Sequence, residues 1–138
     1  MKLLIAGSMK STPQALSYTY RVVERAIECN YEIIVGDNPS GIDRVVIQAC
    51  DKLEVAHYVY HLRKPRFSMF FSVPIKKFAG YDGVDASNRW KKRDRFMVDD
   101  ADIGMFIWNG YSAGTKAGYD YMQSLNKECW IKTYPMEK

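Results

Sequence analysis

The sequence predicts an α/β fold of the Rossmann-like class, a three-layer sandwich built on a five-stranded parallel sheet. Short apolar runs alternate with segments whose apolar residues recur every three or four positions, which is the pattern of strands joined by helices. Three of these apolar runs open directly into loops of small residues. Right-handed crossovers then favour the strand order 3-2-1-4-5, and the 138 residues are expected to form one domain, 1–138.

The first half of the chain predicts three strands and two helices. Residues 2–6 hold a Leu-Leu-Ile core that is typical of a buried strand. Ser11, Thr12 and Pro13 supply a hydroxyl cap and a first-turn proline, so a helix is expected from there to about Cys29. Further apolar runs predict strands at 32–35 and 56–60. Between them, small residues predict a loop at 36–41, and apolar residues at helical spacing predict a helix at 42–53.

The regular pattern breaks in an insertion at about 61–86, which contains Pro65 and Pro74 and shows no helical or strand period. Residues 61–95 hold ten Lys and Arg against three Asp, a balance of +7 in a chain of net charge +4. This concentration of charge indicates an anionic partner. We therefore expect the insertion to cover the ligand crevice as a lid. Its basic and aromatic residues are Arg63, Lys64, Arg66, Phe67, Phe70, Phe71, Lys76, Lys77, Phe78 and Tyr81.

The second half predicts a helix at 87–100, a strand at 103–108, a helix at 116–126 and a strand at 130–133. The apolar run at 103–108 is typical of a buried central strand. A loop of Gly, Ser, Ala and Thr follows it directly, at 109–115.

A strand, a small-residue loop and a helix in succession form an arrangement that binds anions. Gly110 and Gly114 let the backbone approach a ligand, while Ser112 and Thr115 add hydroxyl donors or cap the helix. In the predicted sheet the strand order reverses between the first and fourth strands, so the loops that follow them flank a crevice. An ordinary strand-to-helix turn without a ligand is the alternative explanation of these residues.

Four stretches together resemble the SLOG superfamily of Rossmann-like proteins. They are Leu4–Ser8, Gly36–Arg44, Arg93–Val98 and Trp108–Thr115. The resemblance covers nearly the whole chain and favours the compact YpsA- and YspA-like branch, which is related to Lonely-Guy phosphoribohydrolases and DNA-processing protein A. It implies a nucleotide or nucleotide-derived ligand at the carboxyl edge of the sheet.

The resemblance also implies individual ligand-binding residues. They are Gly7 and Ser8 against the ligand, Gly36, Gly41 and Asp43 as a second wall, Arg93 from its helix, and Gly110, Ser112, Gly114 and Thr115 around the phosphate. An arginine can grip a phosphate through two hydrogen bonds, and Asp43 could accept hydrogen bonds from ribose hydroxyls. The alternatives are a surface charge for Arg93 and a first-turn acid facing the helix dipole for Asp43.

One position departs from the Lonely-Guy pattern. Those enzymes carry a Pro-Gly-Gly-x-Gly-Thr loop and, three residues later, a catalytic Glu, but the residue three after Thr115 is Gly118. Asp120 lies a further two residues on, about 200° around the helix, and is a poor substitute. Whether the chain is an enzyme is therefore left open, with Asp37 and Asp43 as the candidate catalytic acids.

Three functions are compatible with these observations. The leading hypothesis is binding of a nucleotide-like small molecule, such as a signal nucleotide or an ADP-ribose derivative. The second is hydrolysis of an N-glycosidic bond in such a ligand, with one of the two acids as the general acid or base. The third, nucleic-acid binding through residues 61–95, has less support because the rest of the chain is net acidic.

Other classes of site have little support in the sequence. No cofactor is expected, and no metal site, because His57 and His61 have no partner at ligand spacing. Three cysteines without a CxxC pair, and no signal or membrane segment, predict a cytoplasmic protein. Apolar residues on the outer helices would suit a homodimer.

Overall fold

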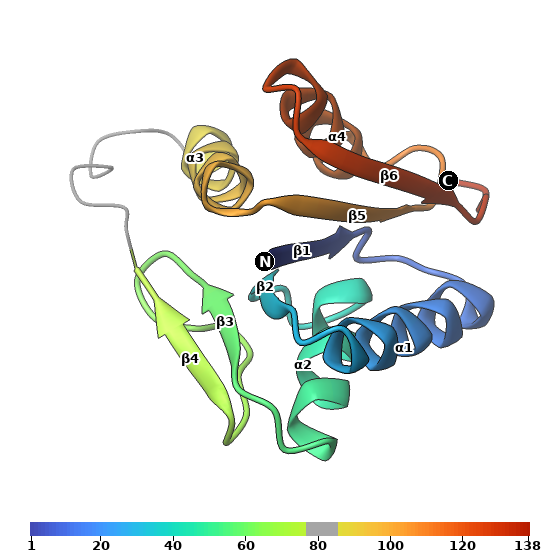
Figure 1. Ribbon diagram of the computed structural model, residues 1–138. Helices are drawn as coiled ribbons and strands as arrows, with labels where there is room; N and C mark the ends of the chain where they lie inside the picture. The colour runs from blue at the N-terminus through green and yellow to red at the C-terminus, as the bar shows by residue number, and fades with distance from the viewer. Residues whose placement is uncertain (77–85) are drawn as a thin grey trace.

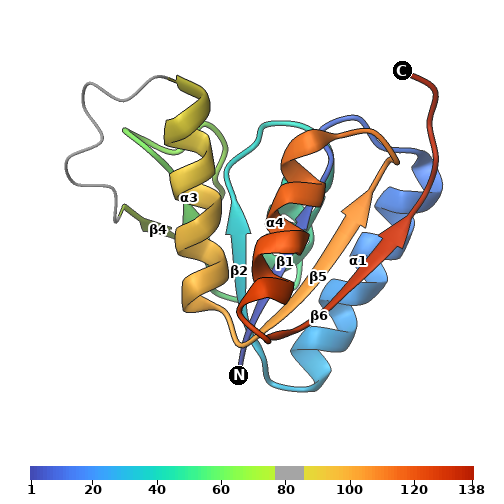
Figure 2. The same cartoon turned by 90° about the horizontal axis from the view of Figure 1, so that it is seen from above.

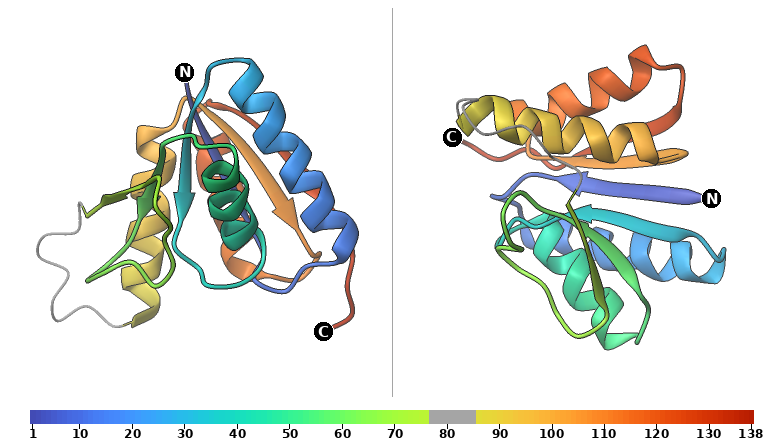
Figure 3. Two further views of the ribbon diagram at one scale, coloured as in Figure 1. Left: turned by 90° about the horizontal axis from the view of Figure 1, so that it is seen from below. Right: turned by 90° about the vertical axis from the view of Figure 1, so that its left-hand side faces the viewer.

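The computed structural model describes residues 1–76 and 86–138, and all their side chains except those of 86–88. A parallel sheet forms the middle layer, with strand order β4-β3-β2-β1-β5-β6. Helices α1 and α2 cover one face, and α3 and α4 cover the other (Figure 1, Figure 3). The lid residues Lys77, Phe78 and Tyr81 lie outside the described residues.

The helices and strands have the following bounds. The strands are β1 (Lys2–Gly7), β2 (Glu32–Gly36), β3 (His57–Tyr60), β4 (Ser72–Ile75), β5 (Ile103–Trp108) and β6 (Glu128–Thr133). The helices are α1 (Pro13–Glu28), α2 (Ile42–Lys52), α3 (Ala86–Asp100) and α4 (Ala113–Ser124). Within the part of the chain that the structure describes, none of the helices is long and apolar enough to cross a membrane.

The five predicted strands are present in the predicted order, and the α/β class is confirmed. The sixth strand, β4, lies inside the insertion that the sequence predicts to be irregular, so that prediction is wrong at this point. Four residues with Pro74 among them give no readable alternation. Proline is tolerated here because β4 pairs only with β3, at the edge of the sheet.

Strands β1 and β5 lie side by side at the centre of the sheet, with Leu3 paired to Ile103 and Gly7 to Ile107. Successive residues of β1 enter different cores, as the alternation of a strand requires. Ile5 packs in the core beneath α1 and α2, and Leu4 packs in the core beneath α3 and α4. Both side chains are fully buried, which explains the continuous apolar run.

Helix α4 begins at Ala113, three residues before the predicted start. The side-chain Oδ1 of Asn109 accepts the N–H groups of Tyr111 and Ser112, at 3.1 and 2.9 Å, and so closes the loop early. Gly114 and Thr115 therefore lie in the first helical turn rather than in a loop.

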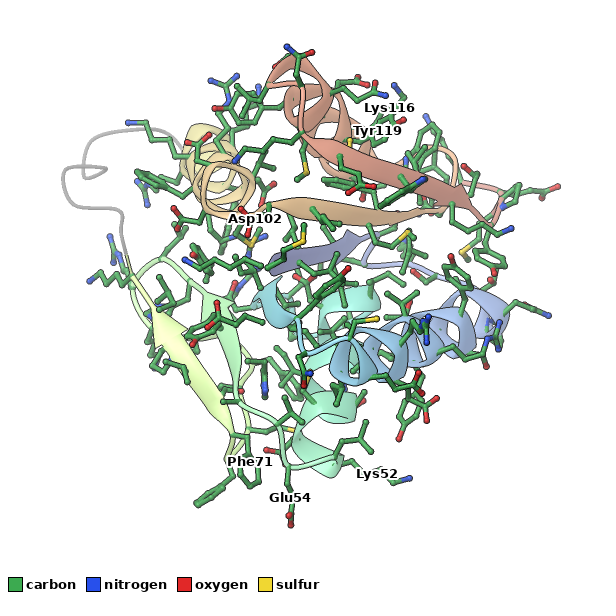
Figure 4. The ribbon with its side chains drawn as sticks, viewed as in Figure 1. Lys52, Glu54, Phe71, Asp102, Lys116 and Tyr119 are labelled. Carbon is green, nitrogen blue, oxygen red and sulfur yellow. The ribbon has the colours of Figure 1, made fainter. Side chains whose placement is uncertain are left out.

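Part of the predicted lid lies away from the crevice. Phe71 precedes β4, and its carbonyl accepts the N–H of His57 at 3.3 Å, at the amino ends of β3 and β4. Figure 4 shows Phe71 close to Glu54, beyond the end of α2. Phe70 stacks edge-on against Phe71 and is 88% exposed. The lid prediction is therefore wrong for these two aromatic residues, whereas Arg66 of the same insertion reaches the crevice.

Candidate functional site

A cavity of about 280 Å³ lies above β1 and β5, between α3 and α4, which run side by side over the sheet (Figure 2). This volume is close to the lower limit of ~300 Å³ that is usual for small-molecule sites. The cavity is lined by Leu4, Ala6, Gly7, Met9, Asn38, Asp43, Arg66, Trp90, Arg93, Asp94, Met97, Val98, Phe106, Ser112, Gly114, Thr115 and Gly118. Its position at the reversal of strand order is where ligands bind in open α/β sheets.

One end of the cavity is formed by the first turn of α4. Ser112 is the N-cap residue, but its side chain accepts no backbone N–H of the helix, and its Oγ shares a hydrogen bond of 3.3 Å with Thr115 Oγ1. A Cβ added at Gly114 would meet nothing within 4 Å. In α1, by contrast, Thr12 Oγ1 accepts the N–H of Ala15 at 3.1 Å. The α4 terminus therefore presents N–H groups, hydroxyls and open space, which suit an anion.

Ser8 lies behind this end of the cavity. Its Oγ accepts the N–H of Asn109 at 3.1 Å and lies 3.4 Å from Thr115 Oγ1. Asn109 is held in turn by a hydrogen bond from Nδ2 to the carbonyl of Lys10 at 2.9 Å. The loops after β1 and β5 are thus joined, and Thr115 is positioned from behind.

The opposite end of the cavity is a cluster of charged groups around Trp90. Arg93 donates to Asp37 Oδ1 at 2.7 Å and to Asp94 Oδ1 at 2.9 Å. Arg66 donates to the same Asp37 oxygen at 3.0 Å through its side chain, and to Oδ2 at 2.9 Å through its backbone N–H. The guanidinium of Arg66 lies 3.8 Å from the centre of the Trp90 ring. Both arginines are therefore engaged by carboxylates and by the indole.

The two candidate acids differ in their ionisation. Burial would raise the pKa of Asp37, but the hydrogen bonds from Arg66 and the charge of Arg93 outweigh it and hold this pKa below its ordinary value. Burial raises the pKa of Asp43 to about 6, with the charge of Arg93 opposing the shift. Asp43 also lines the cavity, whereas Asp37 does not. Asp43 is thus the better placed of the two to exchange a proton.

Two of the predicted glycines allow close packing behind the cavity wall. A Cβ added at Gly36 would lie 2.6 Å from Asp43 Oδ2 and 2.9 Å from Arg93 Nη2. Gly41 has a φ of +77° and packs against the backbone of Met9. Gly36 thus leaves room for Asp43 and Arg93 to come together, and Gly41 lets the loop before α2 pack on the loop after β1; neither glycine lines the cavity.

The structure brings most of the predicted binding residues to one place. Those that line the cavity are Gly7, Asp43, Arg93, Ser112, Gly114 and Thr115. Those outside its lining are Ser8, Gly36, Gly41, Gly110 and the catalytic candidate Asp37. Gly110 has a φ of +93° and turns the chain near Pro135.

Sequence reasoning missed three polar or aromatic residues of the lining, which are Asn38, Trp90 and Asp94, and it placed Arg66 over the crevice only as one of several lid residues. Trp90 and Asp94 lie three before and one after Arg93, so the helical period around a predicted site residue could have indicated Trp90. No comparable sequence pattern indicates where Arg66 lies, because its position depends on the path of the insertion at 61–86. Gly118 lines the cavity, and a Cβ there would lie 3.2 Å from the Phe106 ring.

Comparisons with solved structures place this arrangement among known folds. The molybdenum cofactor binding protein of the phototrophic bacterium Rippkaea orientalis superposes with a TM-score of 0.78 at 13% identity, over 96% of this chain and 76% of that one. The molybdenum cofactor carrier protein of Chlamydomonas reinhardtii gives 0.72 at 14% identity, over 96% and 77%. The single-stranded-DNA-binding DNA processing protein A of Helicobacter pylori gives 0.65 at 14% identity, over 95% and 64%.

The likeness concerns the fold, which is of the Rossmann-like class that the sequence predicts. No protein-family model matches the chain, and no curated protein matches it either.

Proposed function

We propose that this chain, with its SLOG-type Rossmann-like fold, binds a small phosphorylated ligand of the nucleotide type in the cavity between α3 and α4. The observation that carries the proposal is the first turn of α4, which lines the cavity without a side-chain cap. Its N–H groups, the hydroxyls of Ser112 and Thr115, and the space beside Gly114 match the needs of a phosphate. The molybdenum cofactor binding and carrier proteins of similar fold add support for a binding role.

The phosphate is better placed at α4 than at Arg93. Arg93 binds Asp37 and Asp94 through all three of its side-chain nitrogens, and Arg66 binds Asp37 and Asn38 through its Nη2. A phosphate beside this cluster would meet carboxylates that already neutralise the arginines. The ligand would therefore direct its anionic group to α4 and its uncharged part toward Trp90.

Calorimetry with nucleoside monophosphates and their parent nucleosides tests this proposal. The monophosphates are expected to bind at least about tenfold more tightly, since a hydrogen bond to a charged group contributes roughly 1.5–3 kcal/mol. Equal affinities would show that no phosphate is held at α4. Mass spectrometry of small molecules that co-purify with the folded protein would identify the natural ligand.

Hydrolysis of an N-glycosidic bond is a second candidate function, favoured by the buried carboxyl group of Asp43 with its pKa of about 6. Incubation with nucleoside monophosphates, followed by chromatography for the free base, tests it. Release of base that is lost in Asp43→Asn and kept in Asp120→Asn would support an enzyme. Binding without release of base over many hours would leave the binding function alone.

A further inference from the structure

Among the described residues, the charged end of the cavity contains three carboxylates and two arginines. Its cations are Arg66 and Arg93, and its acids are Asp37, Asp43 and Asp94. Asp37 is bound by both arginines and Asp94 by Arg93. Asp43 forms no ion pair with a described residue at hydrogen-bond distance, although the positive charge of Arg93 lowers its pKa.

Asp43 is also incompletely hydrogen-bonded. Its side chain is almost fully buried, at 3% exposure. Among the described residues, its one hydrogen bond comes from the N–H of Asn38 to Oδ2 at 3.2 Å. The second oxygen, Oδ1, has no donor there, and the residue lines the cavity. Among the described residues, Oδ1 is not one of the fully buried atoms that lack a partner, so it is open to the cavity and can accept an N–H group from a ligand.

From this geometry we infer that Asp43 selects a heterocycle presenting an amide N–H beside an exocyclic amine, as the guanine and pterin rings do. The inference rests on the proposed function, because it assumes that the phosphate lies at α4 and the ring at the charged end. Adjacent N–H groups can bind one carboxylate together, here one at the free Oδ1 and the other at Oδ2, which accepts the N–H of Asn38 as well.

An adenine ring fits this end poorly. Its corresponding edge carries one amine beside a ring nitrogen that accepts hydrogen bonds, and that lone pair would face the oxygen of Asp43. Neither Asp43 nor Asp94 can donate to it while ionised. Hydrogen-bond donors of Arg93 that could compensate are already bound to Asp37 and Asp94. The site thus favours guanine. It also disfavours adenine, because the ring nitrogen of adenine and the carboxylate oxygen of Asp43 would face each other as two acceptors.

The size of the cavity favours a mononucleotide or a pterin phosphate over a dinucleotide. Its volume is about 280 Å³, below the range of several hundred Å³ that larger ligands need. Its lining includes the apolar side chains of Met97 from α3 and Phe106 from β5, together with the indole of Trp90. These walls suit a flat ring whose polar edge turns toward Asp43.

The first experiment is calorimetry at pH 7.5 with the monophosphates of guanosine, inosine and adenosine, with guanosine itself, and with a pterin monophosphate. Guanosine monophosphate is expected to bind about tenfold to a hundredfold more tightly than adenosine monophosphate, the size usual for a two-bond pairing of this kind. Inosine monophosphate, which lacks the amine, should lie between them. The pterin arm shows whether the natural ligand is a nucleotide or a pterin.

The variant Asp43→Asn keeps the shape of the side chain and should remove this preference, while Asp120→Asn, an exposed acid on α4, should keep it. Equal affinity of the wild type for the guanine and adenine nucleotides would overturn the inference and leave the proposed function standing. If guanosine bound as tightly as its monophosphate, the proposed function would fail instead.

A second measurement uses the wild-type protein alone, in case Asp43→Asn does not fold. Two N–H donors stabilise the ionised carboxylate, so guanosine monophosphate should displace a proton from Asp43 at about pH 6. The charged groups around it are Arg93 and Asp94 of α3 and Asp37 after β2. The pKa of Asp37 is lowered and that of Arg93 is raised, so these two remain ionised at pH 6, whereas burial raises the pKa of Asp94. Calorimetry in two buffers of different ionisation enthalpy detects the released proton, and its absence would count against the inference.

Discussion

Arg93 of α3 donates a hydrogen bond of 2.7 Å to Asp37, and both side chains are almost completely buried. The pair joins α3 to the carboxyl end of β2, and the two residues lie 56 positions apart in the sequence. Burial makes the pair sensitive to the loss of one partner, because the remaining charge cannot return to water.

Arg93→Ala is expected to lower the free energy of unfolding by about 3–5 kcal/mol, the usual cost of breaking a buried ion pair on one side. Urea denaturation followed by circular dichroism measures it. Arg95→Ala, at an exposed position on the same helix, should change stability by no more than ~0.5 kcal/mol. A loss below about 1 kcal/mol for Arg93→Ala would show that Arg66 alone satisfies Asp37.

Gly114→Val is expected to abolish binding of the phosphorylated ligand with little change in unfolding. The new side chain meets no protein atom at Cβ, so it projects into the space assigned to the phosphate. Ala117→Val, also exposed and on α4 but not in the cavity lining, is the matched control and should bind normally. Calorimetry and thermal denaturation of both variants check the prediction, which unchanged affinity in Gly114→Val would contradict.

Asp43→Asn should stabilise the fold at alkaline pH and have little effect in acid. The pKa of Asp43 is raised from 3.8 to about 6, so the folded state holds the proton more tightly than the unfolded state. Stability from this group is present below pH 4 and is lost as the pH rises through 6, a total of roughly 3 kcal/mol. Urea denaturation at pH 4 and pH 8 should show the variant's advantage only at pH 8.

Lys127 binds the end of α3 to the start of β6. Its ammonium donates to the carbonyls of Val98, Asp99 and Ala101 at 3.0, 2.7 and 2.9 Å. Lys127→Ala should therefore cost about 1.5–3 kcal/mol of stability, measured by urea denaturation. Lys116, which is labelled in Figure 4, forms an exposed ion pair with Asp120 on α4, and Lys116→Ala should cost less than ~1 kcal/mol. Equal losses in the two variants would contradict the role given to Lys127.

The sequence predicts five of the strands and the small-residue loop after β5, because these depend on local patterns. The apolar run Ile103–Trp108 identifies the central strand without tertiary information. The small residues that follow it identify the start of α4 in the same way. The bonds of Arg93 were not predictable in the same way. The sequence suggests a phosphate ligand for this arginine, whereas folding supplies Asp37 and Asp94 as its partners.

The remaining differences also come from contacts distant in sequence. The placement of Arg66 against Asp37 depends on the insertion returning past β2, which no periodicity encodes. The early start of α4 depends on the side chain of Asn109, whose hydrogen bonds to Tyr111 and Ser112 compete with a longer loop.

Pro74 has a consequence for self-association of the sheet. The carbonyls of Phe71 and Ile75 accept N–H groups from β3, so Ser72 and Pro74 between them direct their backbone outward. Ser72 N–H is bound to the carbonyl of Met69, and proline has no N–H. An extended segment arriving at β4 therefore finds no free donor at either position. The β4 edge of the sheet therefore resists edge-to-edge aggregation. Among the described strands, the other edge is β6, and strand addition is expected there instead.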